Sequence, residues 1–463
     1  MHLEQIYLAC LSQASYLIVD ERTKTAVVVD PRRDVEVYLE KAARLGATIR
    51  HVLLTHFHAD FLAGHLELRE RTGATIHLGA RGKAEYPVEP MREGGTLELG
   101  DVHLRFLETP GHTPESVCIL VTDLAKDPAK PVAVLTGDTL FIGDVGRPDL
   151  MVAAGMRAED LAGMLHASLQ KLLALPDETL VYPGHGAGSA CGKNLSSDTS
   201  STIGVQRRVN YALQPMSKAE FVGLVTADQP AAPAYFAYDA GLNRSEHATL
   251  GKVLQRALAP LPLDDALRHV QGGALLLDTR DADAHAAEHL RGAINVGLSG
   301  RYASWVGTLF DPERPIVLVT APGKEEESAL RLGRIGFDRV LGFVAGGTEA
   351  ARGRPELLVR GARIAREDLA RRLAAPRAPL VLDVRTSNEW NAGHIEGAQH
   401  VVLDDLARSL ERIPRERELV VVCKSGYRSS IARSQLEAAG FARVTDLVGG
   451  MDAWAGAAGA CAR

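Results

Sequence analysis

The sequence predicts a multidomain α/β protein, and three observations support this. The chain has 463 residues, more than a single hydrophobic core usually organises, so we expect roughly two to four domains. Up to about residue 200, short β-rich runs alternate with amphipathic segments and turn signals, as they do in α/β domains. The rest of the chain contains an internal repeat, which predicts two further domains that share one architecture.

Periodicity assigns the elements of the N-terminal part. Runs rich in β-branched and aliphatic residues predict strands at Ala26–Asp30, Ile49–Thr55, Ala74–Gly79, Val102–Pro110 and Val132–Asp138. Val35–Leu45 and Phe61–Thr72 are predicted to be helices. Gly184–Ser201 is rich in Gly, Ser and Asn and is predicted to be a loop, and Tyr235–Arg244 is expected to be irregular.

The repeat sets the remaining domain boundaries. Its corresponding segments are Leu275–Val296 with Leu380–Val401, Ile316–Gly323 with Leu419–Gly426, and Gly336–Gly347 with Gly440–Gly450. The first pair shares a strand ending in Asp-x-Arg, a helix, and then His-x-x-Gly-Ala. Each copy spans about 100 residues, a reasonable size for a small domain. We therefore expect domains at residues 1–255, 256–357 and 358–463.

Composition excludes several classes of function. The net charge is −6 and no run of Lys and Arg forms a basic stripe, which argues against nucleic-acid binding. No stretch of about 20 apolar residues occurs, so no membrane span is expected. The N-terminus has no basic region of the kind that opens a signal peptide. The five cysteines form an odd and widely scattered set, which argues against a framework of disulfide bonds. We therefore expect the protein to reside in a reducing cytoplasm.

Metal-binding residue types recur at or just after the predicted strand ends. They are His56, His58, Asp60, His112, Asp138 and His185. Loops at the strand ends of an α/β sheet converge on one site. A lone loop histidine is most often an ordinary surface residue, but the joint pattern predicts a metal centre. Imidazoles with a carboxylate suit Zn or Fe, and two His with one carboxylate and open positions suit non-haem iron.

The order HxHxD, Gly-His-Thr, Gly-Asp and Gly-His resembles the metallo-β-lactamase superfamily, which includes glyoxalase II, over about residues 1–250. The resemblance implies an αββα sandwich. Dinuclear members read HxHxDH, whereas Phe61 follows Asp60 in this chain. By resemblance, Phe61 removes a ligand of the second metal position, which disfavours a two-metal hydrolase.

Gly137–Leu150 resembles the persulfide dioxygenases of this superfamily, including members fused to rhodanese modules. The resemblance implies one Fe(2+) per chain. The implied iron ligands are His56, His112 and Asp138, and the residues implied to orient ligands and water are His58, Asp60 and His185. Arg147 is expected either to bind an anionic part of the substrate or to form a structural ion pair. Tyr235–Arg244 also resembles a segment of this family, without a role that its residues suggest.

Cys423 follows an apolar strand pattern and precedes a helix pattern. Nearby backbone N–H groups and a helix N-terminus favour the thiolate, although a lone cysteine is more often buried and inert. The loop beginning at Cys423 resembles the CxxGxR active-site loop of rhodaneses, and the resemblance covers about residues 360–458. It implies a persulfide on Cys423 and loop N–H groups that cradle an anion. The implied substrate-binding residues are Lys424, Ser425, Gly426, Tyr427 and Arg428.

Two other positions bear on the sulfur chemistry. Aligning the repeat puts Thr320 where Cys423 stands, and the acidic residues Glu325–Glu327 follow it, so the middle copy is expected to be an inactive rhodanese-like scaffold. Cys191 is close in sequence to His185. It is expected to be either an accessory thiol that contacts substrate or relays sulfur, or a small loop residue.

The function predicted is oxidation of a low-molecular-weight thiol persulfide by O2 to sulfite at the iron, followed by sulfur transfer at Cys423 to give thiosulfate. Persulfides of glutathione, bacillithiol and coenzyme A remain open as donors. One alternative is a dinuclear zinc thioester hydrolase that resembles glyoxalase II. Another is a non-catalytic sulfur carrier or sensor. The resemblance is also compatible with a homo-oligomer, because relatives with this fold often self-associate.

Overall fold

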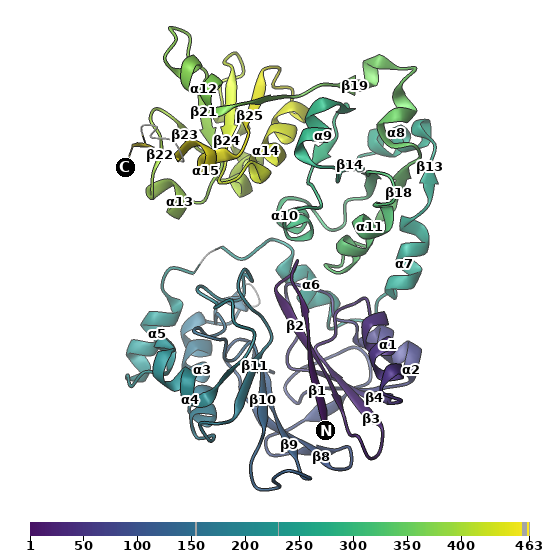
Figure 1. The fold of residues 1–463 in the computed structure, drawn as a ribbon, viewed down its shortest axis with the longest axis vertical. Helices are drawn as coiled ribbons and strands as arrows, with labels where there is room; N and C mark the ends of the chain where they lie inside the picture. The colour runs from purple at the N-terminus through teal and green to yellow at the C-terminus, as the bar shows by residue number, and fades with distance from the viewer. Residues whose placement is uncertain (153–154, 230, 456–460, 463) are drawn as a thin grey trace. The chain divides into compact units, whose positions relative to one another are not determined.

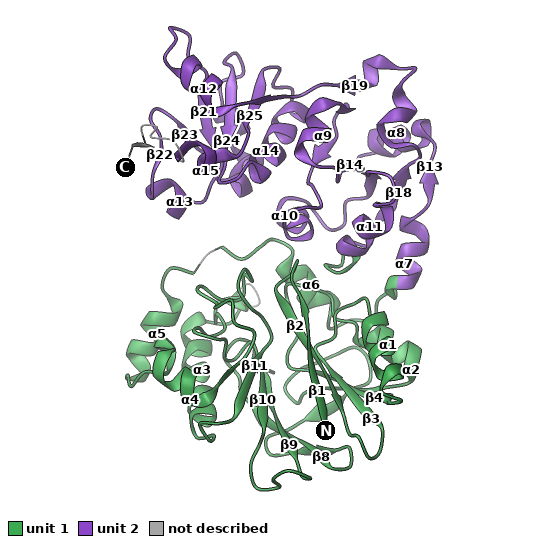
Figure 2. Ribbon diagram, in the orientation of Figure 1, with its two compact units in different colours: residues 1–250, 333–336 green, residues 251–332, 337–463 purple. Residues whose placement is uncertain are grey.

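The computed structural model describes residues 1–152, 155–229, 231–455 and 461–462. The chain divides into two compact units, which Figure 2 distinguishes by colour. Unit 1 comprises residues 1–250 and 333–336, and unit 2 comprises residues 251–332 and 337–463. Among the described helices, none combines the length and the apolarity that a membrane span requires.

Unit 1 contains two six-stranded sheets. The first has the order β1 (His2–Leu8), β2 (Gln13–Val19), β3 (Thr25–Val29), β4 (Thr48–Leu54), β5 (Thr75–Gly79) and β6 (Glu89–Met91). The second has the order β12 (Ser201–Thr202), β11 (Leu180–Pro183), β10 (Ala133–Gly137), β9 (Val117–Asp123), β8 (Val102–Glu108) and β7 (Thr96–Glu98). The outer helices are α1 (Glu36–Arg44) and α2 (His65–Thr72) on one side, and α3 (Ala158–Leu173), α4 (Ile203–Val209) and α5 (Lys218–Thr226) on the other (Figure 1). The predicted αββα sandwich is confirmed.

Adjacent residues of one strand pack into different cores, and this joins the helix layers and sheet layers of unit 1. In β3, Val27 packs into the core between the sheets, and Val28 packs into the core under α1. In β10, Leu135 lies between the sheets, and Val134 packs into the core beneath α3 and α5. Successive side chains of a strand point to opposite faces, so a strand buried on both faces is apolar throughout. This is why these strands could be read from continuous apolar runs.

The five predicted strands and the helix predicted at Val35–Leu45 lie within two residues of their observed bounds. Two predictions were wrong. Helix α2 begins at His65 rather than Phe61, because the Asn243 side chain accepts the N–H of Ala63 and donates to the carbonyl of Phe61. Tyr235–Arg244 was expected to be irregular, but it contains helix α6 (Phe236–Leu242).

Unit 2 begins with α7 (Leu250–Ala257) at its boundary and contains two parallel five-stranded sheets of identical topology. The middle copy has the order β13 (Pro260–Leu261), β18 (Val340–Val344), β17 (Ile316–Val319), β14 (Leu275–Asp278) and β16 (Ile294–Asn295). The last copy has the order β20 (Ala362–Ile364), β25 (Val444–Leu447), β24 (Leu419–Val422), β21 (Leu380–Asp383) and β23 (Gln399–His400). Each strand of one sheet thus has a counterpart in the other, as the repeat predicts.

Helices flank both sheets of unit 2 (Figure 1). Those of the middle copy are α8 (Leu263–Gln271), α9 (Ala282–Ala287), α10 (Tyr302–Leu309) and α11 (Glu325–Gly333). Those of the last copy are α12 (Arg366–Leu373), α13 (Ser387–Asn391), α14 (Tyr427–Ala438) and α15 (Gly450–Ala455). Two short antiparallel pairs complete the unit, β15 (His289–Leu290) with β19 (Leu358–Val359), and β22 (His394–Ile395) with β26 (Cys461–Ala462).

Two stacked histidines of the middle copy pack against helix α14 of the last copy. The rings of His285 and His289 lie 3.8 Å apart, and Nδ1 of His285 lies 2.9 Å from a guanidinium nitrogen of Arg433. Nε2 of His289 lies 3.6 Å from a carboxylate oxygen of Glu437. Burial, reinforced by His289 and Arg433, lowers the pKa of His285 to about 2, and burial lowers the pKa of His289 to about 4.

These depressed pKa values predict that acid destabilises unit 2. Well above pH 6.5 both histidines are neutral whether the chain is folded or not. Below about pH 6.5 the unfolded chain binds protons that the folded unit does not, so stability falls as the pH is lowered. At pH 5.5 the loss should be about 2 to 3 kcal/mol for the pair.

Fluorescence can follow this loss in the whole chain, because its three tryptophans (Trp305, Trp390 and Trp454) all belong to unit 2. Urea unfolding at pH 7.5 and 5.5 should show a smaller acid effect in the double variant His285→Gln/His289→Gln. The exposed His269 gives the control His269→Gln, which should keep the pH dependence of the parent. An unchanged pH dependence in the double variant would contradict the assignment.

Candidate metal centre and cysteine loop

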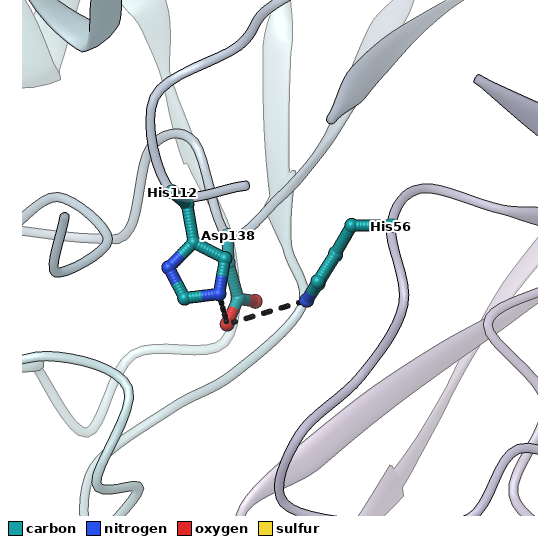
Figure 3. Close-up of side chains that lie close together, drawn as sticks. All are labelled: His56, His112 and Asp138. Carbon is teal, nitrogen blue, oxygen red and sulfur yellow. Dashed lines mark ion pairs between the residues drawn. The ribbon is translucent and has the colours of Figure 1, made fainter. Parts of the chain in front are cut away.

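The polar residues of the first constellation stand at the ends of four strands. His56 follows β4, His112 follows β8, Asp138 follows β10, and His185 follows β11. The strands belong to both sheets of unit 1, so the sandwich brings the four loops together at one edge. Figure 3 shows His56, His112 and Asp138 turned toward one another.

The His56, His112 and Asp138 side chains form a compact, buried triad. Oδ2 of Asp138 lies 3.8 Å from Nε2 of His56 and 3.5 Å from Nε2 of His112. One potential ligand atom from each residue lies within 4.8 Å of the other two. Two imidazoles and one carboxylate are a donor set that suits a transition-metal ion such as Zn or Fe.

Hydrogen bonds determine which ring nitrogen of His56 and of His112 is available to bind a metal. The carbonyl of Arg147 can only accept, so the 3.0 Å contact means that Nδ1–H of His112 donates to it. The hydroxyl of Thr55 donates to Asp30, so it accepts from Nδ1 of His56 at 3.0 Å. In the neutral form of each ring, Nε2 then carries the lone pair and faces Asp138, which is the tautomer that a metal ligand needs.

The electrostatics favour a neutral His56 beside an ionised Asp138. Burial, and then the neighbouring His58, lower the pKa of His56 well below its usual value. Burial would raise the pKa of Asp138, but His185 and His56 more than offset this and hold it far below its usual range. His56 and Asp138 can thus bind a cation at neutral pH without first releasing a proton.

His185 lies between two carboxylates. Its Nδ1 is 2.9 Å from Oδ1 of Asp138, and its Nε2 is 2.8 Å from Oδ2 of Asp60. Burial disfavours the charged ring, but the two carboxylates raise its pKa well above the usual value. A charged His185 donates from Nδ1 to Asp138 and so orients that carboxylate. Nε2 of His58 lies 3.0 Å from Oδ1 of Asp30, and Phe61 packs on the His58 ring with centroids 4.3 Å apart.

A second group of potential ligands lies beside the triad. Asp60, His185 and Cys191 are buried, and one ligand atom from each lies within 4.8 Å of the others. Burial, and then the carboxylates of Asp60 and Asp138, raise the pKa of the Cys191 thiol well above its usual value. Because a metal or an electrophile needs the thiolate, this environment disfavours both ligation and nucleophilic attack by Cys191.

The cysteine loop of unit 2 has the predicted strand–loop–helix context. Cys423 directly follows β24 and is buried, and α14 begins at Tyr427. The N–H of Gly426 donates to Sγ of Cys423 at 3.1 Å, and Gly426 has a φ of 97°, which favours glycine. The sulfur therefore lies over the first turn of α14, where partial positive charge stabilises an anion.

Helix α15 holds the same loop from the other side. The N–H groups of Met451 and Asp452 donate to the carbonyls of Cys423 and Lys424, at 2.7 and 2.9 Å. A Cβ at Gly450 would lie 2.3 Å from the carbonyl oxygen of Cys423, so only glycine permits this approach. The sequence Gly-Gly-Met-Asp-Ala-Trp thus serves to support the loop.

Of the other loop residues, two are exposed to solvent and three form specific contacts. Lys424 and Ser425 are exposed, and Gly426 bonds to the sulfur. Arg428 forms a bidentate pair with Glu389 at 2.6 and 2.7 Å. Burial would raise the pKa of Glu389, but the hydrogen bond from Arg428 lowers it to about 2. The hydroxyl of Tyr427 donates to the carbonyl of Gly297 in the middle copy at 2.6 Å.

The middle copy has no thiol at the corresponding position. Thr320 follows β17, the counterpart of β24, and its hydroxyl donates to Glu325 at 3.3 Å. The acidic residues Glu325–Glu327 open helix α11 where the basic loop of the last copy opens α14. The structure therefore places Thr320 where the alignment of the repeat places it.

Comparison with known proteins identifies the domains. A metallo-beta-lactamase superfamily model matches residues 8–185, and a rhodanese-like domain model matches residues 263–353 and 365–457. A metallo-beta-lactamase structure from Staphylococcus aureus is 30% identical, with 98% of its chain and 74% of this one covered at a TM-score of 0.66. The chain belongs to the metallo-β-lactamase superfamily. It carries two rhodanese-like domains in addition.

Other relatives of this metallo-β-lactamase-superfamily protein match a smaller share of the chain. A hydroxyacylglutathione hydrolase of Rhodospirillum rubrum is 36% identical over 173 residues, which are 37% of this chain and 60% of that protein. The probable metallo-hydrolase YqgX of Bacillus subtilis is 32% identical over 195 residues, which are 38% of this chain and 85% of that protein. The chain thus spans only about three fifths of the hydroxyacylglutathione hydrolase.

Arg147 of the metallo-β-lactamase domain is buried beneath the triad. It forms a bidentate pair with Asp149 at 2.6 and 2.7 Å, and it donates to the carbonyl of Ala190 at 3.2 Å. Its own carbonyl accepts from His112. These contacts are those that the structural alternative predicts, and they make Arg147 a support for His112.

Sequence reasoning missed two residues that hold the metal-binding loops of this domain. Asp30 accepts the N–H and the hydroxyl of Thr55, at 2.8 and 2.7 Å. It thereby orients the Thr55 hydroxyl, which accepts from Nδ1 of His56. Asn243 donates to the carbonyls of His58 and Phe61, both at 2.8 Å. The likeness of Tyr235–Arg244 to persulfide dioxygenases pointed to the segment that contains Asn243, but not to this contact.

Proposed function

We propose that this protein oxidises a low-molecular-weight thiol persulfide with O2 to sulfite at a mononuclear non-haem iron, and that it transfers sulfur at Cys423 to give thiosulfate. The observation that carries the proposal is the triad of His56, His112 and Asp138 with Phe61 directly after Asp60. An imidazole at position 61 would serve a second metal, and a phenyl ring does not. The rhodanese-like cysteine loop in the same chain supports sulfur as the element transferred.

The residues of the first site fit iron in charge, number and tautomer. Iron supplies redox chemistry toward O2, which zinc lacks. His56, His112 and Asp138 would hold the metal, and His185 keeps the carboxylate of Asp138 oriented. Burial of the triad keeps bulk water from the reacting groups, which strengthens electrostatic interactions there. Binding both reactants in one geometry removes much of the entropic barrier to their reaction.

The second step needs only the cysteine loop. The Cys423 thiolate attacks the outer sulfur of a second persulfide, the sulfur–sulfur bond of that donor breaks, and the donor leaves as a thiolate. Sulfite then attacks the outer sulfur on Cys423, which forms thiosulfate and restores the Cys423 thiolate. The N–H of Gly426 faces the sulfur and stabilises its negative charge in both states.

A second candidate is a dinuclear metal thioester hydrolase. Two observations favour it: the relatives named hydroxyacylglutathione hydrolase, and the group formed by Asp60, His185 and Cys191 beside the triad. The environment argues against it, because both nitrogens of His185 face carboxylates and the pKa of Cys191 is raised. Oxygen uptake with glutathione, bacillithiol and coenzyme A persulfides, beside a thioesterase assay, separates the two functions.

Metal content should also separate them. Protein from iron-sufficient cells is expected to hold about one iron per chain by mass spectrometry of the metal, because the triad, of the two ligand groups among the described residues, is the one that suits iron. Phe61→His supplies an imidazole at the missing position and should raise the total toward about two. A parent protein with close to two zinc ions per chain and thioesterase activity would refute the iron proposal.

A further inference from the structure

Helix α14 presents a polar face to the middle copy of unit 2. Tyr427, Ser430 and Ser434 are three and four residues apart, so they lie on one side of the helix. The hydroxyl of Tyr427 donates to the carbonyl of Gly297, and that of Ser430 donates to Oδ1 of Asn295, both at 2.6 Å. The hydroxyl of Ser434 accepts the N–H of Asn295 at 2.9 Å. These bonds fix the position and rotation of the helix.

Asn295 is itself held firmly. Its Nδ2 donates to the carbonyls of Asp278 and Arg280 at 3.1 and 2.8 Å, while Oδ1 accepts from Ser430. The residue at the corresponding place in the last copy is His400, whose Nε2 bonds to the matching carbonyl of Arg385 at 2.8 Å. Asn295 therefore keeps the local bond of the repeat and adds a bond to the helix of the other copy.

The ring of Tyr427 lies directly on Gly300. A Cβ at Gly300 would be 2.4 to 2.8 Å from three atoms of that ring, closer than real Cβ atoms come. The carbonyls of Leu298 and Gly300 are held in turn by the guanidinium of Arg331, at 2.6 and 2.9 Å. The middle copy thus holds Tyr427 in one position. Gly300 lies against the ring, and the carbonyl of Gly297 accepts the hydroxyl.

Tyr427 is close to the reactive sulfur of Cys423 in sequence and in structure. Tyr427 is the first residue of α14, and Gly426, which precedes it, donates its N–H to Sγ of Cys423. The hydroxyl of Ser429 contacts the same sulfur at 3.5 Å and bonds to the carbonyl of Gly426. A shift of the first turn of α14 therefore moves the donors around the sulfur.

We infer that the middle copy positions the sulfur-transfer loop of the last copy through Asn295, Gly297 and Gly300, with Tyr427 as the positioning residue. The inference rests on the proposed sulfur transfer at Cys423. It assigns a function to a copy that carries Thr320 at the place of a reactive cysteine. The middle copy holds the N-terminus of α14 close to the sulfur of Cys423. At this distance the N–H groups of the helix stabilise the thiolate and the persulfide.

The test uses the full-length chain and thiosulfate:cyanide sulfurtransferase turnover measured across pH. In Gly300→Ala the new methyl group displaces the ring of Tyr427, and kcat/KM for thiosulfate should fall about 10- to 100-fold. The pH profile of kcat/KM should change as well, because the N–H of Gly426 moves relative to the sulfur. Oxygen uptake in the persulfide assay should stay at the parent rate.

The matched control is Gly353→Ala in the same copy. A Cβ there meets nothing within 4 Å, and neither glycine has a positive φ, so alanine is tolerated in both backbones. Tyr427→Phe keeps the ring and removes only the bond to Gly297, and should lower kcat/KM by about 3- to 10-fold. If Gly300→Ala unfolds, as tryptophan fluorescence would show, Tyr427→Phe still tests the inference.

Combining Gly300→Ala with Tyr427→Phe should cost no more than Gly300→Ala alone, because both changes act through one side chain. Parent-like turnover and an unshifted pH profile in both single variants would overturn the inference, as would strictly additive losses. Cys423→Ser is assayed beside them. If parent turnover does not depend on Cys423, the proposed function fails; if it does depend on Cys423 but the variants match the parent, only the positioning role fails.

Discussion

His112→Ala is expected to abolish oxygen uptake with a thiol persulfide and to leave sulfurtransferase turnover near the parent level. His112 offers one of the three candidate ligand atoms of the triad, with Nε2 at 3.5 Å from Asp138 and Nδ1 held by the carbonyl of Arg147. Loss of a residue that merely orients a ligand lowers metal affinity or activity about 10- to 100-fold, so loss of a ligand itself should cost at least about 100-fold. An oxygen electrode and metal analysis measure both consequences.

The same strand offers a matched control. His103 lies half-buried on β8, whose end leads to His112, and it is not among the residues of either ligand group. His103→Ala should therefore keep its iron and its oxygen uptake. Retained oxygen uptake in His112→Ala would show that the triad is not the metal centre. Oxygen uptake absent from the parent protein itself, together with intact sulfur binding at Cys423, would support a sulfur carrier or sensor instead.

The sequence predicted those parts of the site that depend on local pattern. A strand buried on both faces has a continuous apolar run, so its end and the polar residue that follows it can be located from the sequence alone. This holds for His56 after β4, for Asp138 after β10 and for Cys423 after β24. The shared architecture of the two domains in unit 2 could also be predicted, because the repeat aligns segments of one copy with segments of the other.

Contacts between distant segments could not be predicted in this way. Asn243 holds the carbonyl of His58 across 185 residues of sequence, and no local pattern marks an asparagine for that task. Two further bonds of the same side chain place the start of α2 at His65, because the backbone groups of Phe61 and Ala63 bond to Asn243 instead of entering a helix. Helix α6 was missed because the buried face that stabilises it, with Phe236 and Asp239, forms only in the folded unit.

Adjacent residues of one sequence motif can also have different structural roles. Position in the rhodanese-like loop suggested substrate contacts for every residue from Lys424 to Arg428. In the structure, Gly426 faces the sulfur, Arg428 is paired with Glu389, and the Tyr427 ring is seated on Gly300 of the other copy. The direction of a side chain depends on the helix that begins at that point, and the sequence alone did not indicate what that helix packs against.

Cys423→Ser is expected to abolish thiosulfate:cyanide sulfurtransferase activity, by at least about 1,000-fold, since a hydroxyl cannot replace a thiolate as the acceptor of sulfane sulfur. The buried loop survives the exchange, because serine is close to cysteine in shape and can still accept the N–H of Gly426. Cys191→Ser is the companion variant. If Cys423→Ser keeps most of its activity, another thiol is the carrier, and loss of activity in Cys191→Ser would identify it.

Oxygen consumption in Cys423→Ser should continue, because the proposed iron ligands all lie before residue 140 and no rhodanese residue belongs to the triad. Its product should then stop at sulfite, whereas the parent should release thiosulfate as sulfite meets the persulfide on Cys423. Ion chromatography of both anions during turnover distinguishes these outcomes, once the uncatalysed reaction of sulfite with free persulfide has been subtracted. If Cys423→Ser forms thiosulfate as fast as the parent, the two reactions are not coupled through Cys423.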